Sequence, residues 1–173
     1  MITRVNSHRR FANQRRSAEA SPVSTDVAIV PMTSAHVDEL MPYERQMFGS
    51  EAWTANGYRN ELADTKRRYY LAAVDGQGAL VGWAGVMILD ETAEVLTVGV
   101  LPAARRRGVG TALLHGLLTE ADRRGALEIF LEVRVDNDAA QAMYEREGFE
   151  RVGIRPGYYD NGRVDAVVMR RET

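Results

Sequence analysis

Residues 98–114 read Val98-Gly99-Val100-Leu101-Pro102-Ala103-Ala104-Arg105-Arg106-Arg107-Gly108-Val109-Gly110-Thr111-Ala112-Leu113-Leu114. An apolar strand leads into a basic turn with two glycines, and the turn opens directly into an amphipathic helix. Backbone N–H groups at such a helix start point the same way, and the helix dipole favours negative charge there. The stretch therefore predicts a pyrophosphate-binding turn. The alternative is a tight strand-to-helix turn whose arginines are simply solvated.

The composition is that of an ordinary globular protein with a single domain. The chain has 173 residues, of which 45% are hydrophobic and 27% charged, with a net charge of −2. Cysteine is absent, which excludes disulfides, thiolate metal sites and a cysteine nucleophile. No apolar run reaches the roughly 18–20 residues that span a bilayer, and the N-terminus lacks the apolar core of a signal peptide. We expect a cytoplasmic protein, a monomer or weak dimer, whose folded domain holds no metal and binds neither nucleic acid nor membrane.

Residues 1–24 are expected to form a disordered basic tail ahead of one domain over residues 25–173. The tail has sparse, unpatterned apolar residues and a single acid, Glu19, against five arginines: Arg4, Arg9, Arg10, Arg15 and Arg16. A solvated leader is the simpler interpretation, and contact with RNA or ribosomes is the alternative.

Hydrophobic periodicity predicts an α+β fold with a mixed sheet. The expected order is β-α-α-β-β-β-α-β-α-β-β, with strands at 27–30, 69–74, 79–89, 93–100, 127–135, 150–154 and 164–170. The clearest helix follows the glycine turn and ends at Gly125; it has one apolar stripe, formed by Gly110, Leu113, Leu114, Leu117, Leu118 and Ala121. It should connect two parallel strands. Residues 155–163 are expected to form a loop between the last two strands.

The glycine turn matches neither of two well-known phosphate motifs. Walker A needs a lysine after its last glycine, and the only lysine in the chain is Lys66. The G-x-G-x-x-G dinucleotide pattern is also absent, and no parallel Rossmann repeat surrounds the turn. A kinase, a P-loop hydrolase and a Schiff-base enzyme are therefore poor fits.

Arg105-Arg106-Arg107-Gly108-Val109-Gly110 resembles the (Q/R)-x-x-G-x-(G/A) acetyl-CoA signature of the GNAT N-acetyltransferases. The segments around it agree in order and spacing with the RimI branch, which acetylates the N-terminal alanine of a small-subunit ribosomal protein. These segments are Val98-Gly99-Val100, Leu131-Glu132-Val133-Arg134, Asn137 with Ala139-Ala140, Met143-Tyr144-Glu145-Arg146-Glu147-Gly148-Phe149 and Arg155-Pro156-Gly157-Tyr158-Tyr159-Asp160. The resemblance covers about Val27 to Arg170. It implies a twisted, mostly antiparallel sheet of six to seven strands flanked by four helices.

The resemblance also implies where acetyl-CoA, the co-substrate, would bind. The turn formed by Arg105, Arg106, Arg107, Gly108, Val109, Gly110 and Thr111 would hold its pyrophosphate. The strand Val98, Gly99 and Val100 would pair its backbone with the pantetheine arm, and one of its N–H groups would stabilise the oxyanion. Asn137 would contact the same arm, although it is also a natural helix cap.

Glu132 is the candidate general base by this resemblance. It lies mid-strand among apolar residues, on the face of Phe130 and Arg134. The alternative is an ion pair with Arg134 on a solvated face. A modest base suffices for an α-amine, whose reference pKa is about 8 against about 10.4 for lysine, a difference of about 3 kcal/mol.

Tyr144 is the candidate general acid by the same resemblance, donating its phenolic proton to the departing CoA thiolate. A plain core aromatic is the alternative. Tyr158 and Tyr159 are candidate walls of the acceptor site, or else part of a packed loop. The expected reaction is direct attack of a protein N-terminus on the thioester, since the chain has no G-x-S-x-G elbow. Another amine (a protein lysine, a polyamine or a drug) and a catalytically silent CoA-binding domain remain alternatives.

Overall fold

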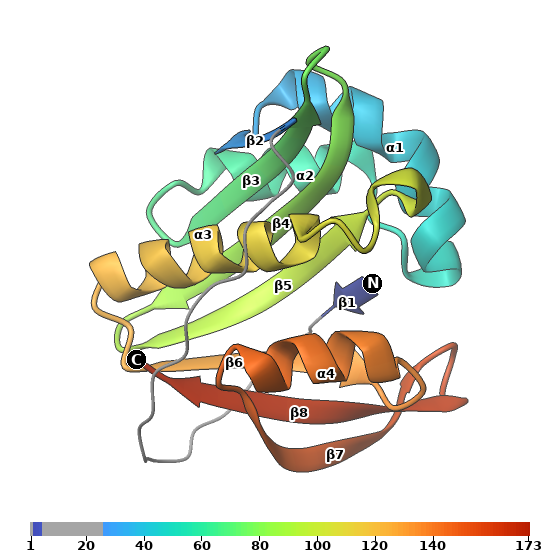
Figure 1. Ribbon diagram of the computed structural model, residues 1–173. Coiled ribbons are helices and arrows are strands. Elements are labelled where there is room, and N and C mark those ends of the chain that lie inside the picture. Colours follow the sequence, from blue (N-terminus) through green and yellow to red (C-terminus); the bar gives the residue numbers. More distant parts are fainter. Residues whose placement is uncertain (1, 5–25) are drawn as a thin grey trace.

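The computed structural model describes residues 2–4 and 26–173 of the chain. Within these residues it has eight strands, four α-helices and two short 3-10 helices, and Figure 1 shows how they are arranged. In chain order they are β1 Ile2–Arg4, β2 Val27–Pro31, α1 Ser34–Phe48, η1 Gly49–Glu51, α2 Ala55–Ala63, β3 Arg68–Asp75, β4 Leu80–Leu89, β5 Thr92–Val100, η2 Pro102–Ala104, α3 Val109–Arg123, β6 Glu128–Arg134, α4 Asp138–Arg146, β7 Glu150–Tyr159 and β8 Val164–Glu172.

The strands form one mixed sheet in the order β2-β3-β4-β5-β6-β8-β7, with β1 attached to β5 off this path. Of these pairs, only β5 and β6 run parallel, and α3 connects them. The predicted α+β class, the mostly antiparallel sheet and the parallel crossover are thus confirmed. The strand β1 adds to the six or seven strands that were expected.

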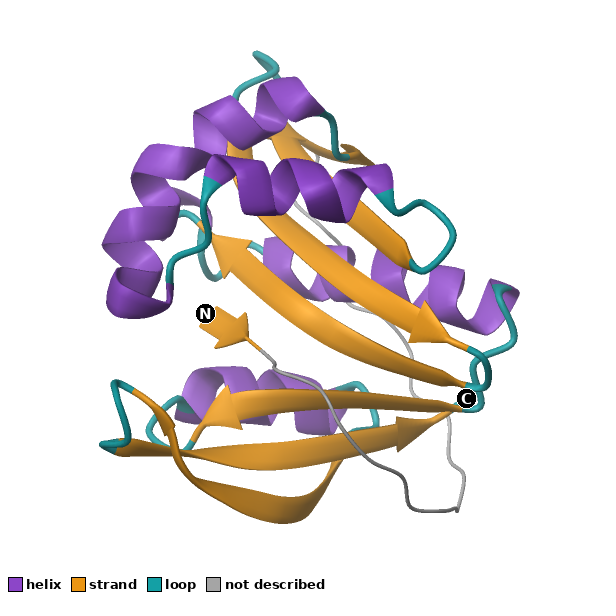
Figure 2. Cartoon of the chain, turned by 180° about the vertical axis from the view of Figure 1, so that it is seen from behind, coloured by secondary structure: helices purple, strands orange, loops and turns teal. Residues whose placement is uncertain are grey.

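Helices cover both faces of the sheet (Figure 2). The side chains of α3 and α4 join one buried cluster with the sheet, and those of α1 and α2 join a second cluster around Trp83. The predicted apolar stripe of α3 is confirmed, because all six of its residues are buried. Its flanking glycines adopt the left-handed conformation that other residues disfavour, with φ of 78° at Gly108 and 85° at Gly125.

The parallel strands β5 and β6 stay together over only three residue pairs and then diverge. Thr92–Glu94 pairs with Glu128–Phe130, and beyond these residues β6 pairs only with β8 on its other side. The register of β5 against β4 shifts near Leu96, since Gly85 pairs with Thr97 and Val86 with Val95. Such a bulge bends and twists a strand. It accounts for β5 turning away from β6, which leaves one edge of each strand without the other as partner.

The expected loop over 155–163 is wrong in its first half, because β7 extends to Tyr159. Pro156 and Gly157 pointed to a loop, since proline lacks an N–H and glycine favours turns. The strand accommodates both residues in an irregular stretch, where its register against β8 shifts between Arg155 and Tyr159. Gly157 supplies a positive φ of 60° there.

The predicted tail falls mostly outside the described residues. Its residues 2–4 form β1, which pairs antiparallel with β5. The division into a tail of residues 1–24 and a domain of residues 25–173 stays a prediction.

Gly99 packs so closely against its neighbours that a larger residue at this position should destabilise the protein. A Cβ at this position would lie 2.7 Å from two ring carbons of the fully buried Trp83. We expect Gly99→Ala to lower the free energy of unfolding by about 1–3 kcal/mol, the usual cost of overpacking a core. Urea denaturation measures this loss. Gly153→Ala is the matched control, because a Cβ there meets no atom within 4 Å; equal effects of the two variants would contradict the packing argument.

Candidate active site

The turn between β5 and α3 presents backbone N–H groups at the start of a helix. The first hydrogen bond of α3 runs from the N–H of Ala112 to the carbonyl of Gly108, 2.9 Å away. Helix geometry therefore leaves the N–H groups of Val109, Gly110 and Thr111 without an acceptor inside α3. These groups can hold an anion at the positive end of the helix dipole.

Positive charge surrounds the same turn. Arg105, Arg106 and Arg107 are all exposed, and the Arg105 Nε donates to the carbonyl of Val100 at 3.1 Å. Arg106 has a positive φ of 63°. The residues predicted for the pyrophosphate are thus adjacent in one turn, and their chemistry fits a phosphate ligand.

The strand predicted for the pantetheine arm lies at the β5–β6 divergence. The side chains of Val98 and Val100 are buried in the core. The backbone of Val98 and Gly99 is paired with β4 on one side and with β1 on the other. Contact between this strand and a co-substrate stays a prediction.

Glu132 is buried in the middle of β6, with 5% of its surface exposed. Its Oε1 accepts a hydrogen bond from the Arg155 guanidinium, and its Oε2 is buried and makes no hydrogen bond within the described part of the chain. Burial raises the pKa of Glu132 to about 7, although Arg155 acts in the opposite direction. A carboxylate with that pKa exchanges protons readily near neutral pH, which suits a general base.

Arg155, rather than Arg134, is the ionic partner of Glu132. The predicted alternative, an ion pair between Glu132 and Arg134, is wrong, because Arg134 pairs with Asp136 and Asp160 at 2.8 Å each. Sequence reasoning missed Arg155, which lies on β7 and must reach past the intervening strand β8. No local pattern in the sequence indicates a pair across two strand boundaries.

Tyr158 and Tyr159, the candidate walls of the acceptor site, lie beside Glu132. The Tyr159 hydroxyl donates to the backbone carbonyl of Glu132 at 3.1 Å, and the Tyr159 side chain is buried. The Tyr158 ring packs edge-on against it with centroids 4.9 Å apart, and the Arg155 guanidinium lies 5.0 Å from the Tyr158 centroid. The packed interpretation of Tyr159 is therefore confirmed, and contact of either tyrosine with an acceptor stays a prediction.

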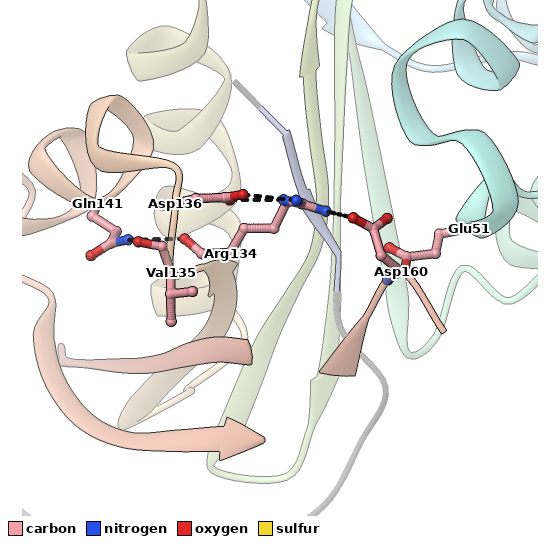
Figure 3. Close-up of polar contacts among 6 residues, drawn as sticks. All are labelled: Glu51, Arg134, Val135, Asp136, Gln141 and Asp160. Carbon is pink, nitrogen blue, oxygen red and sulfur yellow. Dashed lines mark hydrogen bonds and ion pairs between the residues drawn. The ribbon is translucent and has the colours of Figure 1, made fainter. Parts of the chain in front are cut away.

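A polar chain ties the end of β6 to the opposite half of the molecule (Figure 3). Arg134 binds Asp160, and the Asp160 N–H donates to the Glu51 carboxylate at 2.7 Å, across 109 positions of sequence. The Gln141 amide donates to the carbonyls of Arg134 and Val135. The turn after Tyr158 and Tyr159 is thereby held to both β6 and η1. Sequence reasoning missed the contact between Glu51 and Asp160 because it is long-range. It also assigned no role to Gln141, whose contacts lie only six and seven positions away.

A buried carboxylate organises the neighbouring α1–α2 region. Glu44 is fully buried and accepts hydrogen bonds from the Tyr58 hydroxyl and the Trp53 N–H, at 2.9 Å each. The Tyr58 hydroxyl also accepts from the Trp83 indole at 3.1 Å. Burial among hydrogen-bond donors from two aromatic residues gives Glu44 a structural role.

Tyr144 is fully buried on α4, and its ring packs edge-on against Phe149 at 5.8 Å. The Phe149 N–H donates to the Tyr144 carbonyl, so Phe149 folds back over the helix end. Asn137 caps the same helix by accepting from the Ala140 N–H at 3.3 Å. These observations confirm the packing and capping interpretations, while an acid role for Tyr144 and a cofactor contact of Asn137 stay predictions.

Two further features bear on the sequence expectations. Among the described residues, no group of three or more His, Cys, Asp or Glu side chains is placed to hold a metal ion. No helix in those same ranges has the length and hydropathy needed to cross a membrane.

Comparison with known proteins places the chain in a family. The model of the acetyltransferase (GNAT) family matches residues 34–149. The chain is 41% identical to N-alpha-acetyltransferase RimI of Mycobacterium tuberculosis over 162 residues, covering 91% of this chain and 97% of that protein. It is 42% identical to an uncharacterized protein of Mycobacterium leprae, of which it spans only 45% while 91% of this chain is covered.

A solved structure shares the fold. The ribosomal-protein-S18-alanine N-acetyltransferase of Escherichia coli superposes with a TM-score of 0.73 at 27% identity, covering 84% of this chain and 93% of that one. Sequence and structure therefore agree with the resemblance drawn from the glycine turn. The chain belongs to the acetyltransferase (GNAT) family and is an acetyl-CoA-dependent N-acetyltransferase.

Proposed function

We propose that this enzyme acetylates the N-terminal α-amine of a protein, and that the N-terminal alanine of ribosomal protein S18 is its first candidate acceptor. The similarity to RimI and to the S18-alanine enzyme supports this acceptor class. The observation that carries the proposal is the buried Glu132, whose pKa lies near neutrality beside the two tyrosines of the β7–β8 turn. Such a base matches an α-amine, whose pKa of about 8 lies only slightly higher.

The reaction we propose is direct attack within a ternary complex. Glu132 accepts a proton from the substrate ammonium, directly or through water, and the neutral amine attacks the thioester carbonyl. A backbone N–H of Val98–Val100 stabilises the oxyanion. The C–S bond then breaks, and Tyr144 donates its phenolic proton to the departing thiolate. The nitrogen releases its second proton as the amide forms, and this proton returns Tyr144 to its neutral form. The turn of Arg105–Thr111 holds the pyrophosphate, and Asn137 contacts the pantetheine arm.

Mass spectrometry of two synthetic peptides tests the acceptor class. The first peptide carries the alanine-initiated N-terminus of S18 and the second is its N-terminally blocked twin, each incubated with enzyme and acetyl-CoA. We expect a gain of one acetyl group on the free peptide only. Acetylation of both peptides would indicate a lysine acceptor, and acetylation of neither, with CoA binding intact, would indicate a different amine.

Arg155 is expected to act as a positioning residue that sets the protonation of Glu132. Its guanidinium opposes the effect of burial on the Glu132 pKa. Without it that pKa rises further, and because a base works only when deprotonated, the rising limb of kcat/KM should move to higher pH. For Arg155→Met we expect a shift of about one pH unit or more, the usual effect of losing an adjacent opposite charge.

The pH profile of kcat/KM with the alanine peptide measures this shift. Arg155→Lys is the control, because lysine keeps the positive charge and should retain most of the original profile. A profile of Arg155→Met that coincides with that of the wild type would show that Arg155 does not tune the base.

A further inference from the structure

The edge of β5 at the β5–β6 divergence is occupied by the chain's own N-terminal segment. In β1, Ile2 pairs with Gly99, Thr3 with Val98 and Arg4 with Thr97. Both views show β1 between β5 and the part of the sheet that begins with β6 (Figures 1 and 2), and β1 contacts both strands. It therefore fills the space that opens where β5 and β6 separate.

This edge is suited to receive an extended backbone. After Glu94, β5 loses its pairing with β6, and its N–H and C=O groups on that side become available to another strand. The Thr97 hydroxyl is also buried at this point and makes no hydrogen bond within the described ranges. The structure thus contains a strand-addition site inside the sheet, and its occupant is a peptide backbone.

Two ligands need the same residues of β5. Val98 and Gly99, which pair with β1, are also two of the three residues whose backbone is predicted to pair with the pantetheine arm of acetyl-CoA. One strand edge cannot pair with both. We propose that Ile2–Arg4 is an intramolecular competitor of acetyl-CoA, and that the N-terminal segment must leave the β5 edge before the pantetheine arm enters. This inference rests on the proposed function.

The short length of β1 makes the competition reversible. β1 is only three residues long, whereas the β4–β5 pair has eight register partners, and a ladder that short is marginal by itself. Residues 5–25 connect it covalently to the domain, so it is always present at a high effective concentration. A weak but permanently tethered strand lowers the affinity for acetyl-CoA without abolishing it.

Proline substitutions in β1 test the inference with the full chain. Of two neighbouring strand residues, one directs its N–H toward a given partner strand. Thr3→Pro combined with Arg4→Pro therefore removes a donor to β5 whichever residue provides it. The matched control is Gln14→Pro combined with Arg15→Pro, which adds two prolines and removes one arginine outside β1.

Titration calorimetry with CoA gives the first result. We expect the β1 variant to bind CoA about five- to tenfold more tightly than the wild type, the gain expected when a segment docked in about 80–90% of molecules is released. The control should bind like the wild type. The nucleotide 3′-phospho-ADP keeps the pyrophosphate of CoA but lacks its pantetheine arm. It should bind to all three proteins with equal affinity.

Hydrogen exchange gives the second result, because it reports β1 without any ligand. The amides of Thr97–Gly99 that face β1 should lose protection in the β1 variant and keep it in the control. Unchanged protection, unchanged CoA affinity, or an equal gain for CoA and the nucleotide would each overturn the inference. If none of the three proteins binds CoA, both the proposed function and the competition are wrong. If all three bind CoA with equal affinity, only the competition is contradicted.

Discussion

Glu132→Gln should lower kcat/KM for the alanine peptide on the order of 100-fold at pH 7, because positioned general bases contribute at least that much. Glutamine keeps the size of the side chain and can still contact Arg155, but it cannot accept the proton. The dependence on pH should change as well. In the wild type, kcat/KM should rise with pH as Glu132 loses its proton near pH 7. In the variant, the only remaining rise should be the one near pH 8, where the substrate α-amine loses its proton.

Glu128→Gln is the matched control for this prediction. Glu128 lies on the same strand, pairs with Arg170 and stands at the end where β5 and β6 are still joined. We expect nearly unchanged activity for Glu128→Gln and unchanged CoA affinity for both variants. If Glu132→Gln retained its activity and the limb near pH 7, Glu132 would not be the base.

Tyr144→Phe should lower kcat on the order of 100-fold while leaving the affinity for CoA nearly unchanged. The variant removes only the hydroxyl, so the ring keeps its edge-on contact with Phe149 and the fold should persist. Without the phenolic proton the thiolate must depart unprotonated, which raises the barrier of that step. Steady-state kinetics with acetyl-CoA and the alanine peptide separate kcat from KM.

Tyr43→Phe serves as the control, because Tyr43 is exposed on α1 and removal of its hydroxyl should not affect the rate. An unfolding midpoint measured for each variant separates chemistry from stability. A loss confined to KM, or one matched by a large fall in stability, would show that Tyr144 acts through packing.

Much of the fold follows from local patterns. The apolar stripe of α3 has helical spacing, and Gly108 and Gly125 mark its ends because they adopt positive φ. The parallel crossover through α3 follows from the order of its elements. Glu132 and Tyr144 could be singled out by their place in short motifs, and Arg105–Thr111 by its position at the start of a helix.

Contacts between distant segments could not be predicted in this way. Arg155 reaches Glu132 past another strand, and Asp160 meets Glu51 across 109 positions. The three residues of β1 carry no periodic signal, and Pro156-Gly157 favoured a loop where the structure forms an irregular strand. In the first three cases the partner lies far away in sequence, so no local pattern indicates it. In the last case, pairing with β8 overrides the local preference for a loop.

The sequence by itself determined the family, the helix with its anion-binding turn, and the residue types available for acid and base, because periodicity, glycines and short motifs are local properties. Only the tertiary structure decided the environment of Glu132, the anchoring of the β7–β8 turn, and the occupant of the β5 edge. The occupant of the β5 edge depends on where β5 separates from β6, next to the bulge near Leu96, and the other two depend on which strands the sheet brings together. Burial and pairing are properties of the packed molecule, and they set both the pKa of the base and access to it.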